Sequence, residues 1–345
     1  MSPHILVTGG NGFIAVHVIS LLLQHGYTIT TTVRSQSKTA HLRRIFSAAV
    51  VDNQLLFAIV EDITVVGAFD EVVKNNKFNA VLHISSPVIF NVTDIENDIL
   101  KPAIKGTTGL LQSIKSHGPT VKRVVITSSF AAIVDLSKGD RPGYAYSEKD
   151  WDPITEEEAK QNAGLGYTGS KKLAEKAAWD FIENEKPGFD LVTLCPPMVY
   201  GPALQEVPSL DRLNHTSKGI YAIFSGQDKE LQQTLIKIWA DVRDVAKAHL
   251  AAIETPQAGN NRFLISEGQF NVGRLSDFIW KTYPERAQAK GIPKSKPEHY
   301  LPGGTYYPDN SKSKQILGLE YNSFENALKD TLDQFIALEK ELGVE

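Results

Sequence analysis

The chain has 345 residues, of which 42% are hydrophobic, and its 36 basic and 40 acidic residues leave a formal net charge of −4. This length supports a substantial core, and the mixed charge excludes the basic face that is typical of nucleic-acid-binding proteins. A single cysteine, Cys195, excludes an internal disulfide and a cysteine-rich zinc site. Because no apolar stretch reaches the about 18 residues of a membrane span and no basic leader is visible, we expect a cytoplasmic protein with no membrane, nucleic-acid or metal partner.

Short β-rich runs alternate with longer helical segments over the first 130 residues. Expected strands cover 4–8, 27–34, 55–62, 78–87 and 121–129, and expected helices cover 12–26, 37–49 and 96–118. The strands are mostly apolar runs, as in sheets that are buried on both faces. This alternation predicts an α/β fold, a Rossmann-type doubly wound parallel sheet with helices on both faces.

The pattern loosens after about residue 196, where a stretch rich in Pro, Gly and Ser begins. A helix over 241–254, a strand over 261–266 and an amphipathic closing helix over 323–343 follow. We expect residues 1–196 to form the dinucleotide-binding domain, with segments of about 236–266 returning to it. Residues 197–345 would then form most of a smaller, mainly C-terminal α/β substrate lobe.

Glycines mark the junction between the first expected strand and the first expected helix. Gly9, Gly12 and Ala15 follow a Gly-x-x-Gly-x-x-Ala spacing, and Gly10 adds a further permissive residue. A tight turn of this kind brings the backbone close to a pyrophosphate, and the helix N-terminus offers free N–H groups to the anion. The spacing and its context predict a dinucleotide-binding turn.

The end of the second expected strand discriminates between dinucleotides in such folds. NAD binders usually place a carboxylate there for the ribose hydroxyls. Here the chain reads "TTTVRSQSK", which offers Arg34, Ser35 and Lys38 but no acid. Because a guanidinium can grip a phosphate through two hydrogen bonds, we expect NADPH rather than NADH; the alternative is a solvated basic turn.

Tyr167 and Lys171 lie four residues apart in a stretch with helical periodicity, so they share one helix face. A nearby ammonium and a bound nicotinamide cation would lower the pKa of the phenol from its usual value near 10. Ser128 and Ser129 end an expected strand on the rim where open α/β sheets bind ligands. A serine hydroxyl there can bind a substrate oxygen while the tyrosine supplies the proton.

These motifs together resemble the extended short-chain dehydrogenases/reductases. "VTGGNGFIA", "TSS" and "YTGSK" match that family's cofactor turn and Ser-Tyr-Lys set. "HISSPV", "YTGSKKLAEKAAW", "YGP", "DVRDVAKAHL" and "DNSKSKQILG" resemble the dihydroflavonol reductase-like branch, which includes the fungal NADPH-dependent methylglyoxal and aldehyde (carbonyl) reductases.

The resemblance implies an NADPH-dependent carbonyl reductase, or ketoreductase, whose catalytic residues are Ser129, Tyr167 and Lys171; Ser128 is the weaker alternative. The residues expected at the cofactor are Gly9, Gly12, Phe13, Ile14, Arg34, Lys38, Asp62, Ile63, Ser85, Ser86, Pro87, Tyr167, Lys171, Pro196 and Val199. The side chains expected around the substrate are Phe90, Phe130, Met198, Tyr200 and Tyr221, with Trp239 as a further candidate.

One position departs from the family pattern. Many members carry a water-holding asparagine where this chain has Lys105, which puts the proton relay in doubt but not hydride transfer. Asp241, Arg243 and Asp244 in "DVRDVAKAHL" are expected to hold the second lobe to the sheet rather than to act on a ligand.

We therefore expect reduction of an aldehyde or ketone by a monomer or homodimer. Two alternatives share the fold. A sugar epimerase or dehydratase of the NAD(P)-dependent type would keep the tyrosine, but dehydratases usually place acids after the catalytic serine or threonine, where this chain has Phe130, Ala131 and Ala132. A non-catalytic NADP-sensing regulator would tend to lose the tyrosine and lysine that are present here.

Overall fold

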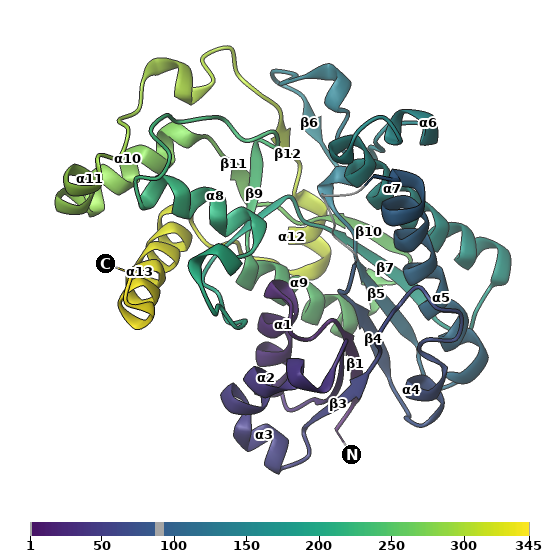
Figure 1. Cartoon of the computed structure of the whole chain (residues 1–345). Helices are drawn as coiled ribbons and strands as arrows, with labels where there is room; N and C mark the ends of the chain where they lie inside the picture. Colours follow the sequence, from purple (N-terminus) through teal and green to yellow (C-terminus); the bar gives the residue numbers. More distant parts are fainter. Residues whose placement is uncertain (1, 87–92, 345) are drawn as a thin grey trace.

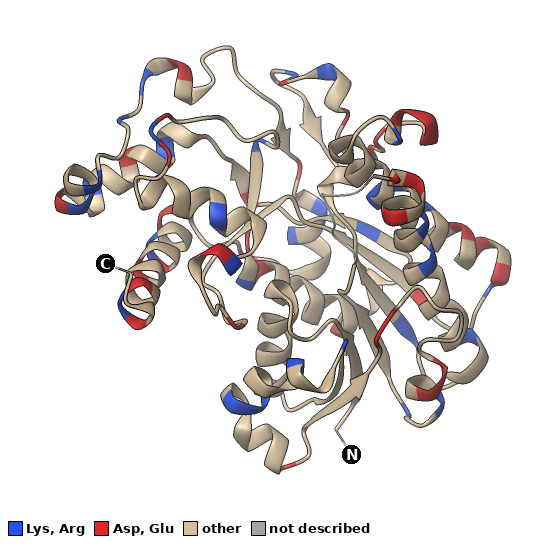
Figure 2. Ribbon diagram, viewed as in Figure 1, with Lys and Arg blue, Asp and Glu red and all other residues tan. Residues whose placement is uncertain are grey.

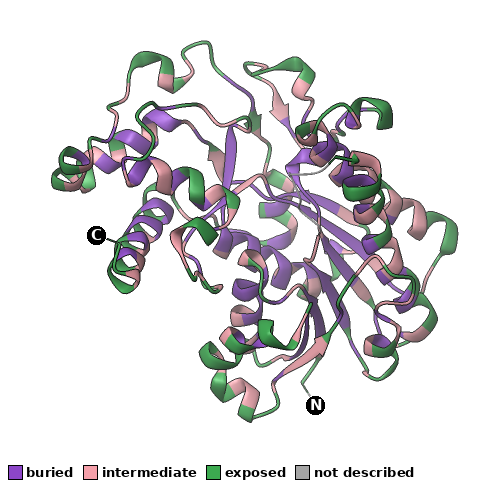
Figure 3. Ribbon diagram, viewed as in Figure 1, coloured by how far each residue is buried: buried purple, intermediate pink, exposed green. Residues whose placement is uncertain are grey.

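The core of the protein is a parallel sheet of seven strands in the order β10-β7-β5-β4-β1-β2-β3 (Figure 1). The computed structural model describes residues 2–86 and 93–344. The central strands are almost wholly buried, which explains why they are apolar runs (Figure 3). Their bounds are β1 His4–Thr8, β2 Thr28–Val33, β3 Leu55–Ile59, β4 Ala80–His83, β5 Arg123–Thr127, β7 Asp190–Cys195 and β10 Asn261–Leu264.

Alternate side chains of the strands enter two separate helix-covered layers. Ile5 and Val7 join a cluster with apolar residues of α1 and α9, whereas Leu6 joins a cluster with residues of α4, α5 and α7. The sheet is therefore covered on both faces, as the strand–helix alternation predicts. The covering helices are α1 Phe13–Gln24 and α9 Val242–Glu254 on one face, and α4 Asp70–Lys74, α5 Lys101–His117 and α7 Ala163–Glu185 on the other.

The strand order reverses beside β1. The chain moves from β1 outward to β2 and β3, and then crosses to β4 on the other side of β1. Such a switch point leaves a crevice at the carboxyl ends of the two strands, here after Thr8 and His83. The fold therefore places the ligand site between the glycine turn and the segment that follows β4.

Three of the differences from the predicted elements concern the large sheet and its helices. The helix expected over 37–49 is a 3₁₀ turn (Gln36–Thr39) followed by α2 Ala40–Ile45 and α3 Ser47–Val51. The long helix expected over 96–118 begins with a π-helical turn, Glu96–Leu100, because Pro102 lacks the N–H that an α-helical register needs. Strand β7 was absent from the predicted elements, although its apolar run ends cleanly at Pro196.

A second lobe forms above the carboxyl edge of the sheet. Its small sheet has the order β11-β9-β8, and Trp239, Phe270, Phe324 and Phe335 are fully buried beneath its helices. The lobe contains β8 Met198–Tyr200, β9 Ile238–Asp241, β11 Gly268–Gln269, α8 His215–Phe224, α10 Val272–Thr282, α11 Pro284–Lys290 and α13 Phe324–Leu342. A two-stranded ribbon joins β6 Ala145–Tyr146 to β12 Tyr307–Pro308, and the short helix α6 spans Glu156–Ala159.

The two lobes are interleaved along the chain. Helix α9 packs on α1 and β10 pairs with β7, so residues 242–264 lie with the large sheet, and α12 Ser311–Leu317 packs against α9 and β10. Basic and acidic residues are spread over both lobes (Figure 2). The predicted boundary at residue 196 falls between β7 and β8, and it stays a prediction.

Candidate active site

The glycine turn follows β1 and is shaped by close backbone contacts. Gly9 has a φ of +71°, and a Cβ there would lie 2.9 Å from Cβ of Ser85. A Cβ on Gly10 would lie 1.9 Å from Oγ1 of Thr31, so that position also excludes a side chain. Gly12 precedes α1 without capping it, and the first turn of α1 holds no acid. The first N–H groups of this 12-residue helix are thus left to an anion such as a pyrophosphate.

A cleft of about 440 Å³ opens at the switch point. It unites nine of the residues that the sequence assigns to the cofactor: Gly9, Gly12, Phe13, Ile14, Arg34, Lys38, Ile63, Ser85 and Ser86. Five further residues line it that the sequence analysis did not name: Asn11, Thr32, Val33, Val60 and Ile84. Each of these is a direct chain neighbour of a strand end or of the glycine turn, so the rule that ligands bind at carboxyl strand ends could have found them.

The basic end of the cleft carries Arg34 and Lys38. Both side chains are exposed, and neither has an ion-pair partner among residues 2–86 and 93–344. Asp62, also predicted at the cofactor, does not line the cleft; its carboxylate accepts hydrogen bonds from the amide and hydroxyl of Thr64 at 2.8 and 2.7 Å. These bonds, and to a lesser degree the charge of Arg34, lower the pKa of Asp62. This end of the cleft therefore presents two cations without ion-pair partners among the described residues.

Two further cofactor predictions, Pro196 and Val199, are absent from the lining of the cleft. The carbonyl of Pro196 accepts a hydrogen bond from the amide of Phe130 (2.9 Å), which ties the end of β7 to the turn after β5. Val199 lies in β8 and is 7% exposed. Pro87, predicted at the cofactor, and Phe90, predicted at the substrate, lie outside the described residues.

The catalytic candidates meet beside this cleft. Helix α7 begins after Asn162, whose side chain accepts a hydrogen bond from the Leu165 amide (3.0 Å), and it carries Tyr167 and Lys171 one turn apart. The hydroxyl of Ser129, just after β5, lies near enough to the phenol of Tyr167 to lower its pKa. The ammonium of Lys171 donates to Oγ of Ser86 at 2.9 Å and lies 5.9 Å from the centroid of the Tyr167 ring.

Burial governs the protonation of this group. Burial raises the pKa of Tyr167 above its ordinary value, and the nearby hydroxyl of Ser129 opposes that rise. The lowering of this pKa that the sequence predicted, by the lysine ammonium and a bound nicotinamide cation together, stays a prediction. In the structure the ammonium of Lys171 is directed to Ser86, and burial has the largest effect on the phenol. Burial also lowers the pKa of Lys171 to about 8. The phenol is therefore protonated at neutral pH, and the lysine titrates near pH 8.

The two serines that follow β5 have different hydrogen-bond partners. Oγ of Ser129 accepts from the amide of Ala131 (3.1 Å) and contacts Tyr167, whereas Oγ of Ser128 donates to the buried carboxylate of Glu175 at 2.6 Å. Ser128 is thus engaged on the inner side of the strand. This geometry favours Ser129 over Ser128 as the residue that faces a substrate.

Glu175 was missed by the sequence analysis, although it lies one helical turn after Lys171. Its carboxylate is fully buried and accepts hydrogen bonds from Thr193 (2.7 Å) and from Nε and Nη2 of Arg262 (2.7 and 3.1 Å). Arg262 in turn donates to the backbone carbonyl of Ala132 (3.0 Å). The pair joins α7, β5, β7 and β10 behind the catalytic residues.

A second buried network supports the cofactor cleft. Oγ1 of Thr8 accepts from the amides of Ile84 and Ser85 (3.0 and 3.1 Å), and it lies 3.0 Å from Nδ1 of His83. Burial, followed by the charge of Lys171, lowers the pKa of His83 to about 3, so its ring is neutral. Thr8 therefore fixes the chain where it turns into the cleft at Ser85.

Most side chains predicted around the substrate are packed in the core. Phe130 is 1% exposed and its ring contacts Tyr146 and Tyr306, with centroids 5.4 and 5.8 Å apart. Tyr200 packs on Phe270, with centroids 5.1 Å apart. Trp239 packs on Phe324, and the hydroxyl of Tyr221 donates to Glu339 at 2.9 Å. Met198 is partly buried. Their contact with substrate stays a prediction.

Lys105 is exposed on α5, where it lines a surface depression with Thr108, Gln112 and His117. That depression shares no residue with the cofactor cleft. The consequence of a lysine at this position for proton relay stays a prediction.

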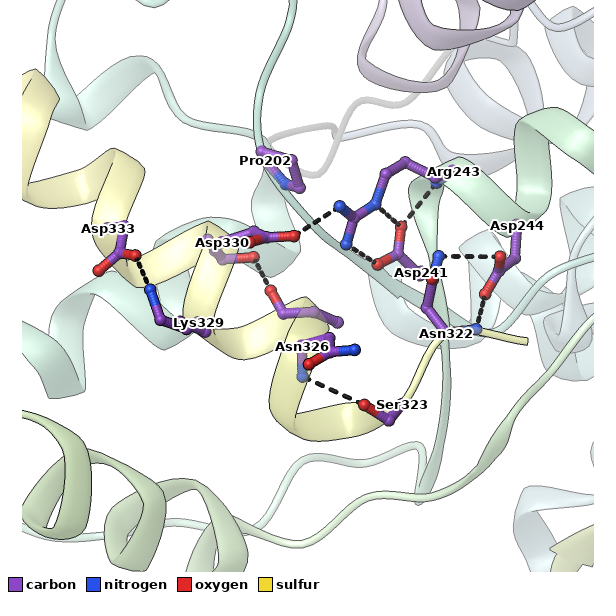
Figure 4. A network of polar contacts seen from close by, with 12 residues as sticks. Pro202, Asp241, Arg243, Asp244, Asn322, Ser323, Asn326, Lys329, Asp330 and Asp333 are labelled. Atoms are coloured by element: carbon purple, nitrogen blue, oxygen red, sulfur yellow. Dashed lines mark hydrogen bonds and ion pairs between the residues drawn. The ribbon is translucent and has the colours of Figure 1, made fainter. Parts of the chain in front are cut away.

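The junction between the lobes contains the "DVRD" residues (Figure 4). The buried carboxylate of Asp241 accepts from Nε and Nη2 of Arg243 (2.9 and 2.6 Å), and Nη1 of Arg243 donates to Asp330 of α13 (2.5 Å). Asp244 accepts from the amide of Asn322 at 2.7 Å. These contacts hold α13 and the segment before it to the β9–α9 turn, which is the structural role that the sequence predicted.

Comparison with known proteins places this geometry among reductases. Residues 5–273 match the model of the NAD dependent epimerase/dehydratase family. The chain is 38% identical to a putative NADPH-dependent methylglyoxal reductase, GRP2, of Candida albicans over 97% of this chain and 99% of that protein, and 40% identical to the ketoreductase azaE of Aspergillus niger over 97% and 98%.

A solved structure of yeast methylglyoxal/isovaleraldehyde reductase Gre2 complexed with NADPH superposes with a TM-score of 0.87 at 33% identity, covering 99% of each chain. Within the part of the chain that the structure describes, no helix has the length and apolar character that a membrane crossing requires.

Proposed function

The chain belongs to the NAD-dependent epimerase/dehydratase family, that is, the extended short-chain dehydrogenases/reductases, and we propose that it reduces an aldehyde or ketone to the alcohol with NADPH. The enzyme is an oxidoreductase that acts on carbonyl groups. The observation that carries the mechanism is the nearness of Ser129 to the phenol of Tyr167, with Lys171 one turn away and bonded to Ser86 in the lining of the cleft.

The cleft fits a phosphorylated dinucleotide on its own chemistry. The uncapped N-terminus of α1 and the side-chain-free turn at Gly9 suit the pyrophosphate, and the unpaired Arg34 and Lys38 suit a 2′-phosphate. Ser85 and Ser86 would line the nicotinamide end, and Lys171, which contacts Ser86, would bind the nicotinamide ribose. When bound, NADPH supplies the pro-S hydride that the carbonyl carbon accepts.

The chain's own residues manage the carbonyl oxygen. Ser129 donates a hydrogen bond to it and thereby stabilises the negative charge that develops. Tyr167, whose pKa burial keeps high, donates the proton that completes the alcohol. Lys171 lies where its positive charge stabilises the phenolate that remains.

We propose substrates among small aldehydes, α-dicarbonyls and ketones, since the relatives include methylglyoxal, isovaleraldehyde and ketone reductases by name. Met198 and Tyr221 are the described candidates for selecting among them. The same proposal includes a cytoplasmic enzyme, active as a monomer or homodimer, whose mixed charge offers no face for a nucleic acid.

An epimerase or dehydratase is disfavoured by the turn after Ser129. Residues Phe130–Ala132 form a buried 3₁₀ turn without a carboxylate, so no acid stands beside the serine for dehydration. A cofactor sensor is disfavoured because the tyrosine and lysine are both present and lie on the cleft's rim.

The test is the loss of reduced-nicotinamide absorbance with a panel of aldehydes, α-dicarbonyls and ketones, run with NADPH and NADH side by side. We expect turnover with NADPH preferred, and we expect Arg34→Ala to reduce that preference. Wild-type protein that binds NADPH but turns over no member of the panel would contradict the reductase assignment.

A further inference from the structure

A second cavity, of about 380 Å³, adjoins the cofactor cleft. Asn11 and Lys38 line both spaces, so the cavity and the cleft lie next to each other on either side of these two residues. His41 of α2 completes the wall from the dinucleotide-binding domain, and the opposite wall consists of Glu206, Pro208 and Arg212. The second lobe therefore reaches the basic end of the cleft through the loop between β8 and α8.

This loop is fixed to both lobes. His17 of α1 contacts the carbonyl of Pro202 and His41 contacts the carbonyl of Leu204, both at 2.8 Å from Nε2. The amide and carbonyl of Ala203 are held by the side chain of Gln334 of α13, at 2.5 and 2.6 Å. Pro202 lies close to the Arg243 junction (Figure 4). The loop that carries Arg212 is thus anchored to both lobes at residues 202–204.

The charge around the two spaces is unbalanced. Arg34, Lys38 and Arg212 are all exposed, and within residues 2–86 and 93–344 none of them forms a hydrogen bond or ion pair through its side chain. Three cations without ion-pair partners, lining two adjoining spaces, favour an anion of high charge. Two acids oppose them: Glu206, on the same wall as Arg212, and Asp62, whose pKa the charge of Arg34 lowers.

We propose that Arg212 is a specificity-determining residue for NADPH, which binds the 2′-phosphate from the second lobe while Arg34 and Lys38 bind it from the first. The guanidinium offers a phosphate two parallel hydrogen bonds, and NADH has no phosphate to receive them. The proposal rests on the proposed function, because it concerns the cofactor of that same site.

Binding of NADPH, NADH, 2′,5′-ADP and ADP to the full-length protein is measured by titration calorimetry. Arg212→Met is expected to weaken the binding of NADPH and of 2′,5′-ADP about tenfold, because one charged hydrogen-bonding partner is lost. The affinities for NADH and ADP should stay within about twofold of the wild-type values. Glu206→Gln removes the opposing charge and is expected to raise the affinity for NADPH without changing the affinity for NADH. Lys218→Met, which removes an exposed cation of α8 outside both spaces, is the matched control and should change neither.

Equal losses for NADPH and NADH in Arg212→Met, or no loss for either, would overturn the assignment of Arg212. The wild-type protein separates this failure from that of the proposed function. If wild type prefers NADPH and Arg212→Met retains the full preference, only the present inference falls. If wild type binds NADPH no better than NADH, the cofactor assignment of the proposed function falls and this inference falls with it.

Discussion

Glu175 offers the sharpest test of how the catalytic helix is held. Its side chain is fully buried and that of Arg262 is 7% exposed, so the pair has almost no access to solvent. Glu175→Gln removes the charge that Arg262 faces and replaces one acceptor oxygen with an NH₂ group. Because Ser128, Thr193 and Arg262 all donate hydrogen bonds to the carboxylate, at least one of these donors would lose its acceptor. Removing one partner of a buried ion pair costs about 3–5 kcal/mol, roughly a fifth or more of a typical domain's stability of about 5–15 kcal/mol.

The assay is equilibrium unfolding in urea, in which the shift of the midpoint, multiplied by the slope, gives the change in free energy of unfolding. Glu185→Gln provides a matched control, since Glu185 lies on the same helix and pairs with Lys115 at the surface, with side chains 44% and 35% exposed. That substitution should cost about 0–1 kcal/mol. A Glu175→Gln protein as stable as the Glu185→Gln control would mean that Glu175 is not the charged partner of Arg262, and the reasoning would be refuted.

Three further predictions concern the site. Because burial lowers the pKa of Lys171 to about 8, kcat/KM for NADPH should fall as the pH rises through about 8 and the ammonium loses its proton. The Lys171→Arg protein should show no such inflection in the pH profile of its residual activity. An unchanged inflection in that variant would contradict the assignment to Lys171. Ser129→Ala should lower kcat about 10²–10³-fold. Ser128→Ala should change kcat only a few-fold but lower the free energy of unfolding by about 1–3 kcal/mol, because it removes a hydrogen bond to Glu175. The reverse pattern would mean that the two serines have exchanged roles. Gly9→Ala should weaken NADPH binding at least about tenfold through strain and contact with Ser85, measured by calorimetry, while Gly26→Ala, with a φ of +79° and open space, should cost stability only.

The sequence was informative where function depends on local pattern. The Gly9 turn is specified by glycines within one strand–helix junction, and the pairing of Tyr167 with Lys171 is set by helical spacing alone. The meeting of Ser129 with Tyr167 followed from the rule that parallel strands end on one rim. These inferences needed no knowledge of which distant side chains touch.

Other features depend on contacts that no local pattern encodes. Glu175 and Arg262 are 87 positions apart, and either could be a solvated surface residue until the strands are paired. Phe130 and Tyr200 show the converse, since an aromatic near a motif fits a pocket or a core equally well, and only packing against Tyr146 or Phe270 places it in the core. The nearness of Arg212 to Lys38 follows from the path of a loop between two lobes.

The central claim is that Tyr167 donates the proton in an NADPH-dependent carbonyl reduction. The direct measurement is single-turnover oxidation of bound NADPH by the best carbonyl substrate, compared between wild type and Tyr167→Phe, with NADPH affinity determined for both. We predict a fall in rate of about 10²–10⁴-fold with nearly unchanged affinity, because only the proton donor is removed. A Tyr167→Phe protein that turns over at the wild-type rate would contradict the account.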